Sequence, residues 1–97
     1  MTQFVIGIEK LTERENESVR KHFSDVGAWW NWIPGFWMVI TREDMRPSKL
    51  RDDIRELVPN KNLIVVRAES TGWSGFGPAT ENRDMFSWIK RNWNSPD

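Results

Sequence analysis

The sequence predicts an α+β domain with the ferredoxin-like order β-α-β-β-α-β, an antiparallel four-stranded sheet and an additional C-terminal helix. Three observations predict it. Short segments rich in β-branched and aromatic residues are separated by helical patterns, a Pro-Gly pair divides the most aromatic stretch, and an amphipathic pattern ends the chain. At 97 residues, we expect one domain that spans residues 1–97.

A strand and a helix open the chain. Residues 3–9, QFVIGIE, form an apolar run bounded by charge, which is typical of a buried strand. Thr12 begins TERE, and Glu15 completes a capping box, which predicts the start of a helix. Apolar residues recur at helical spacing up to Gly27, which is placed to end the helix.

An aromatic hairpin follows. Pro presets φ and Gly accepts positive φ, so Pro34-Gly35 predicts a turn between strands at about 28–33 and 36–42. The segment RPSKLRDDIRELVP then predicts a helix that begins at Pro47 and ends before Pro59.

The last third contains a strand, a glycine-rich loop and a helix. NLIVVRAES predicts the fourth strand. In the loop STGWSGFGPA, Trp73 and Phe76 are large enough that we expect them to plug the core. The final helix is expected at about residues 81–93, with one apolar face.

Strand alternation distributes the hairpin tryptophans to both faces of the sheet. Trp30 and Trp32 are expected on one face and Trp29 on the other. On the next strand, Trp37 is expected on the face opposite to Phe36 and Met38. Two helices cover only one face. We therefore expect the terminal helix to cover part of the other face and a second copy to cover the rest, with these four tryptophans as core and dimer seam.

Charge and composition limit the function. Lys and Arg number 14, as do Asp and Glu, which argues against a general nucleic-acid coat protein and favours self-association. There is no Cys, so thiol and disulfide chemistry are excluded. MTQFVIGIEK does not have the pattern of a signal peptide, and no apolar run is long enough to cross a bilayer. We expect a cytoplasmic protein without membrane contact.

The order FVIGIE, GAWWNWIPGFWMVIT, GWSGF and MFSWIKRNW resembles the small SinR-like proteins. These are relatives of the CRISPR-associated endoribonuclease that is the non-integrase subunit in spacer acquisition. The resemblance implies a ferredoxin-like homodimer. In members reported as nucleases, an Asp at the end of the first strand binds a divalent metal near the dimer axis, and Glu9 stands at that position here. Its extra methylene moves the carboxylate oxygens outward, and Mg²⁺ geometry is demanding.

Glu9 is the candidate catalytic and metal-binding residue. Two copies across a dimer axis could share Mg²⁺ and activate water; alternatively, Glu9 is an ordinary exposed carboxylate at a strand end. Glu43 and Asp44 follow the third strand and could reach the same region. His22, the only histidine, is expected on the solvated face of the first helix.

A modest basic cluster is the candidate ligand site. Arg42, Arg46 and Lys49, with an aromatic side chain such as Trp73, could hold single-stranded nucleic acid by phosphate contacts and base stacking. The alternative is a solvated helix, because acidic residues are interleaved with these bases.

The sequence favours a non-enzymatic homodimeric binding module, with nucleic acid or a nucleotide as its ligand and no cofactor. One alternative is a Mg²⁺-dependent endonuclease that uses Glu9 from both subunits. Another is an interaction or inhibitor protein, for example a viral product that acts on a bacterial defence component. For an interaction protein we would expect an exposed aromatic patch on a neutral surface.

Overall fold

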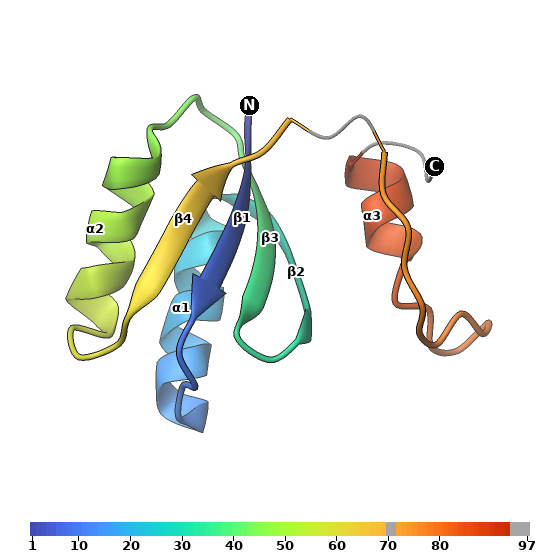
Figure 1. Cartoon of the computed structure of the whole chain (residues 1–97), viewed down its shortest axis with the longest axis horizontal. Coiled ribbons are helices and arrows are strands. Elements are labelled where there is room, and N and C mark those ends of the chain that lie inside the picture. The colour runs from blue at the N-terminus through green and yellow to red at the C-terminus, as the bar shows by residue number, and fades with distance from the viewer. Residues whose placement is uncertain (70–71, 94–97) are drawn as a thin grey trace.

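A computed structural model describes residues 1–69 and 72–93 (Figure 1). Its elements are β1 (Thr2–Ile8), α1 (Glu13–Val26), β2 (Gly27–Ile33), β3 (Phe36–Thr41), α2 (Pro47–Leu57), β4 (Leu63–Arg67) and α3 (Ser87–Asn92). The strands form one antiparallel sheet in the order β2-β3-β1-β4. Helices α1 and α2 lie on one face of the sheet, and α3 lies on the other (Figure 1). The α+β class and the antiparallel sheet are confirmed.

The main core lies between the sheet and the first two helices. Every second residue of the central strand β1 (Phe4, Ile6 and Ile8) is buried on this side. Trp37 of β3 and Phe23 of α1 meet there edge to face, with ring centroids 5.1 Å apart. This cluster fixes α1 and α2 against the sheet.

Helix α1 begins and ends as the sequence predicts, but for a different reason at its end. Thr12 Oγ1 accepts the N–H of Glu15 at 3.2 Å, and Glu15 Oε1 accepts the N–H of Thr12 at 2.8 Å, so the capping box is present. Gly27 caps the other end in an extended conformation. A Cβ there would lie 1.8 Å from the carbonyl oxygen of Ile40, so glycine is required by close approach to β3.

The turn between β2 and β3 follows the Pro-Gly prediction. Gly35 has a φ of 80°, and its carbonyl oxygen accepts the N–H of Ile8 at 2.8 Å. The strand before the turn is irregular, however. The side-chain amide of Asn31 donates to the carbonyl oxygens of Ile33 and Phe36 where the β2–β3 register shifts. This irregularity interrupts the strict alternation near Trp32. Trp32 is 38% exposed where Trp30 is 5% exposed, and the guanidinium of Arg83, from the end of the chain that covers Trp30, lies over its ring.

A second core covers the β2–β3 side of the other face. It joins three strand residues to the C-terminal segment (residues 72–93); its buried members are Trp30, Met38, Ile40, Phe86, Ile89 and Trp93. The indole N–H of Trp30 donates to the carbonyl oxygen of Met85 at 2.7 Å. The expectation that the end of the chain covers part of this face is confirmed.

The C-terminal segment contains less helix than predicted. The expected helix at 81–93 begins only at Ser87, because Thr80 and Arg83 exchange main-chain hydrogen bonds across a tight turn. Asp84 Oδ1 then accepts the N–H of Phe86 at 2.9 Å. Side-chain bonds of this kind compete with helix formation.

The prediction that Phe76 plugs the core is also wrong, since its side chain is fully exposed. The flanking glycines explain this. A Cβ at Gly75 would lie 2.5 Å from the ring of Phe86, and one at Gly77 would lie 2.4 Å from the sulfur of Met85. The backbone itself packs on the second core at both positions, and the residue between them points away.

The β1–β4 side of this sheet face retains exposed apolar residues. Ile64 and Val66 of β4 are 64% and 47% exposed. Val5 of β1 pairs with Val66 and is half-buried. We call Val5, Ile64 and Val66 the open half-face. Separately, no helix within residues 1–69 and 72–93 is long and apolar enough to cross a bilayer.

We expect Trp30→Ala to destabilise the protein by about 3–5 kcal/mol, because it removes a buried indole that joins the sheet to the C-terminal segment. Trp32→Ala, at a 38% exposed position on the same strand, should cost less than about 1 kcal/mol. Urea unfolding followed by circular dichroism measures both free energies. Equal losses for the two variants would contradict the second core.

Candidate functional site

The four tryptophans predicted for a dimer seam lie in different environments. Trp37 has no exposed surface, and Trp30 is 5% exposed beneath the C-terminal segment. Trp29 packs against Trp37 with the rings tilted by 59° and their centroids 5.5 Å apart, and its indole N–H donates to Ser24 Oγ at 2.9 Å. Trp32 is 38% exposed. Packing within the chain therefore accounts for three of the four rings.

Glu9 lies at the end of β1, where it holds the loop before β4. Its Oε1 accepts the N–H of Asn62, and its own N–H donates to the carbonyl oxygen of Asn62 at 3.0 Å. Because Thr41 pairs with Thr2 at the other end of β1, the residues that follow β3 lie far from Glu9. The expectation that Glu43 and Asp44 reach the Glu9 region is wrong. Within the described chain, no group of three potential metal-ligating side chains is present.

The predicted basic cluster is partly neutralised. Lys49 Nζ lies 2.6 Å from Asp53 Oδ1, and this hydrogen bond raises the pKa of Lys49. The other oxygen of Asp53 lies 3.4 Å from His22 Nε2. The side chain of His22 thus faces α2 and is half-buried, and the expectation that it lies on a solvated face is wrong. Arg46 precedes α2 and is exposed. The charge of Lys49 is therefore compensated by the carboxylate of Asp53.

Arg42 retains an uncompensated charge. Its guanidinium donates to the main-chain oxygen of Asp25, at the C-terminal end of α1. That end has no basic residue of its own, so Arg42 supplies the positive group that the helix dipole favours there. A carbonyl oxygen carries no full charge, and the guanidinium remains available to an anion.

The C-terminal segment brings Arg91 to the same place. Arg42 and Arg91 line one hollow of about 330 Å³, and its lining contains no acidic side chain. The other lining residues are Met1, Gly27, Ala28, Ile40 and Asn92. In the described part of the chain, neither guanidinium forms an ion pair with a carboxylate. We call this space the arginine hollow. A second hollow, lined in part by Arg67 and Gln3, adjoins it through Met1, Ile40 and Asn92.

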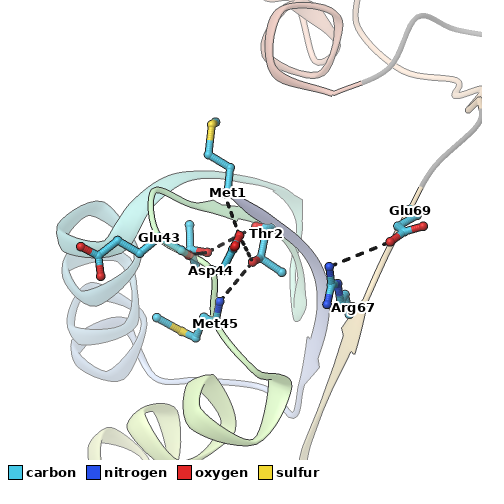
Figure 2. A network of polar contacts seen from close by, with 8 residues as sticks. Met1, Thr2, Glu43, Asp44, Met45, Arg67 and Glu69 are labelled. Carbon is cyan, nitrogen blue, oxygen red and sulfur yellow. Dashed lines mark hydrogen bonds and ion pairs between the residues drawn. The ribbon is translucent and has the colours of Figure 1, made fainter.

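A polar network beside these hollows orders the start of β1 (Figure 2). The N-terminal ammonium lies 2.9 Å from Asp44 Oδ1 and lowers the pKa of that carboxyl group, with Thr2 and Arg67 contributing. Thr2 Oγ1 accepts the N–H of Met45 at 3.1 Å. The carboxylate of Glu43 points away from the network (Figure 2). The network thus pairs the Asp44 carboxylate, which lines neither hollow, with the N-terminal ammonium, while Glu69 lines the second hollow.

Trp73 lies in the second core, away from the other predicted ligand residues. Its ring stacks on Phe86 with centroids 5.6 Å apart, and it lines neither of the two hollows. Sequence reasoning included Arg42 but missed Arg91; the only signal was the basic pair in IKRNW.

Comparison with known protein families, with curated proteins and with solved structures finds no match to this chain. The functional argument therefore depends on geometry, and the arginine hollow is its main feature. Arg42 and Arg91 line it together although they lie far apart in the chain.

We expect Asp44→Asn to lower Tm slightly at neutral pH, because it removes the ion pair with the N-terminal ammonium. The pKa of Asp44 is lowered in the folded state, so its stabilising effect is present above about pH 4 and is lost as pH falls through the folded-state value. Tm measured from pH 7 to pH 2 should converge with that of the wild type at the acid end. Glu43→Gln is the matched control and should change Tm little at any pH; a difference for Asp44→Asn that persists at pH 2 would contradict the assignment.

Proposed function

We propose that this chain is a non-enzymatic, homodimeric binding module of ferredoxin-like fold for a phosphate-bearing ligand, either a nucleotide or a nucleic acid. The element order up to β4 and the strand order β2-β3-β1-β4 support the fold. The aromatic motifs that resemble the SinR-like proteins are consistent with it.

The observation that carries the proposal is the pair of guanidinium groups in one hollow without an acid. Arg42 and Arg91 present planar donors that match two oxygens of a phosphate. Hydrogen bonds between charged partners contribute about 1.5–3 kcal/mol each. The exposed positions of both arginines predict a binding constant that falls as salt concentration rises.

Binding is favoured over catalysis by where the carboxylates lie. Metal-assisted cleavage would require Glu9 to hold Mg²⁺ near the phosphate. Glu9 is at the opposite end of β1 from the arginine hollow, and one of its oxygens holds the N–H of Asn62. We therefore assign Glu9 a structural role in the loop before β4.

The homodimer is supported by the open half-face. Its exposed valine and isoleucine side chains lie on the β1–β4 side of a sheet face whose β2–β3 side is covered by the second core. Burial of such surface contributes about 25 cal/mol per Å². The formal net charge of zero offers no repulsion between copies.

We expect Arg91→Met to weaken binding of a short single-stranded oligonucleotide or of a nucleoside triphosphate about tenfold, since one charged hydrogen-bonding group is lost. Arg42→Met should have the same effect, with circular dichroism as a check because Arg42 also caps α1. Fluorescence anisotropy at several salt concentrations measures the affinity, and each variant should lower the salt slope by about one.

Lys49→Met is the matched control, because Asp53 already neutralises this lysine. It should leave affinity within about twofold of the wild type. Equal losses for Lys49→Met and Arg91→Met would overturn the assignment of the site to the arginine hollow. Comparison of the triphosphate with the oligonucleotide separates the two ligand sources.

We expect the wild type to have twice the monomer mass of 11.5 kDa in light scattering, and Ile64→Lys to shift it to the monomer. A lysine in the open half-face would be desolvated at the interface without a partner. Glu56→Lys, on the exposed side of α2, is the control and should stay dimeric. A monomeric wild type would contradict the homodimer and leave this surface to a different protein, as the interaction-protein alternative requires.

A further inference from the structure

We propose that a third hollow, built around Trp32 at the end of the sheet opposite the arginine hollow, binds a nucleobase that carries an exocyclic amine. It has a volume of about 450 Å³ and lies where the β2–β3 turn meets the start of α1. Figure 1 shows both at the same end of the sheet. The inference deepens the proposed function, on which it rests for the class of ligand.

Trp32 supplies an aromatic wall that the chain holds in place but does not bury. The guanidinium of Arg83 lies over its ring, 5.5 Å from the centroid. The mutual main-chain hydrogen bonds between Arg83 and Thr80 fix that arginine's backbone. Trp32 nevertheless remains 38% exposed and lines the hollow. Stacking of a base on such a ring contributes about 1–3 kcal/mol.

Two asparagines provide the polar groups that a base edge requires. The NH₂ group of Asn31 donates to two main-chain oxygens, those of Ile33 at 3.1 Å and Phe36 at 2.8 Å. Both of its partners are acceptors, so this orientation of the amide is determined. Its Oδ1, which receives no hydrogen bond within the described chain, is the atom left for a ligand.

Asn16 faces the same hollow from the first turns of α1. Its side chain makes no hydrogen bond within the described residues, so it offers both a donor and an acceptor. An acceptor at Asn31 and an adaptable amide at Asn16 complement an amine next to a ring nitrogen, as in adenine or cytosine. Uracil would place a carbonyl oxygen against Asn31 Oδ1.

The charges of the hollow favour a neutral ring over a phosphate. Lys10 and Glu13 both line it, one of each sign, whereas the arginine hollow has two cations and no acid. Its apolar walls come from Ile8, Leu11 and Pro34. An apolar pocket with a few fixed polar groups and one aromatic wall is a typical environment for a small planar ligand.

The Trp32 hollow and the arginine hollow lie at opposite ends of β1, about 20 Å apart at the rise of a strand. One mononucleotide does not span that distance. An oligonucleotide of several nucleotides would place a phosphate between the arginines and a base on Trp32. The pairing of the two sites therefore favours single-stranded nucleic acid over a free nucleotide.

Titration of the ¹⁵N-labelled protein with adenosine, which has no phosphate, tests the base site. We expect adenosine to shift the indole N–H signal of Trp32 and the side-chain amide signals of Asn16 and Asn31, and uridine to bind at least fivefold more weakly. Trp32→Ala and Asn16→Ala should each weaken adenosine binding about tenfold or more. Asn16→Ala replaces a half-buried polar residue in a helix by a good helix former, so it should fold.

Arg42→Met with Arg91→Met is the matched control, and this double variant should bind adenosine like the wild type. Adenosine that leaves the Trp32 signal unmoved, or uridine that binds equally well, would overturn the base site. Inorganic pyrophosphate probes the arginine hollow alone. Binding of pyrophosphate but not of adenosine would refute only the base site; binding of adenosine but not of pyrophosphate would refute the phosphate site of the proposed function.

Discussion

Strand β3 is apolar on both of its faces, and the rest of the structure depends on covering both. Trp37 and Val39 point toward α1 and α2, while Met38 and Ile40 point the other way. At about 25 cal/mol per Å² of apolar surface, leaving either side in water would cost several kcal/mol. The first side is covered by the two long helices. The second requires the chain to return across the sheet after β4.

This return is possible because glycine occurs where backbones meet side chains or other backbones. Gly75 and Gly77 let the loop before α3 pack directly on Phe86 and Met85, within the C-terminal segment, and Gly27 lets β2 approach Ile40. The same return places Arg91 beside Arg42 and Arg83 over Trp32. Both proposed binding hollows are therefore consequences of how the second core is built, since each includes or contacts a residue from the last 15 described positions.

Features with a short-range cause could be predicted from the sequence. The capping box at Thr12 and the Pro34-Gly35 turn each depend on neighbouring residues. Alternation likewise separated Trp29 from Trp30 and Trp37 from Met38. The remainder depended on contacts between distant segments. The register shift at Asn31 depends on hydrogen bonds to main-chain oxygens on both sides of the turn. The exposure of Phe76 depends on the contacts of its neighbours Gly75 and Gly77 with Phe86 and Met85.

The basic cluster illustrates the same division within the candidate site. The pairing of Lys49 with Asp53 follows from their i,i+4 spacing, so sequence alone could have removed Lys49 from the ligand set. The approach of Arg42 to the end of α1 follows from the β2–β3 pairing and could be foreseen only in part. The place of Arg91 in this hollow could not be foreseen, because it depends on how α3 packs in the second core.

The four tryptophans of GAWWNWIPGFWMV differ in burial and in the hydrogen-bond partner of the indole N–H. Trp29 and Trp30 have hydrogen-bond partners for their N–H groups in Ser24 and Met85. Trp37 has none among the described residues although it is fully buried, at a cost of about 1–3 kcal/mol. Its packing between Phe23 and Trp29 must outweigh the lost hydrogen bond. Trp32 is different: it is not part of the second core, lies under the guanidinium of Arg83 and keeps over a third of its surface in solvent. Packing explains three of these residues, and the fourth is where a ligand is the better explanation for so large a ring.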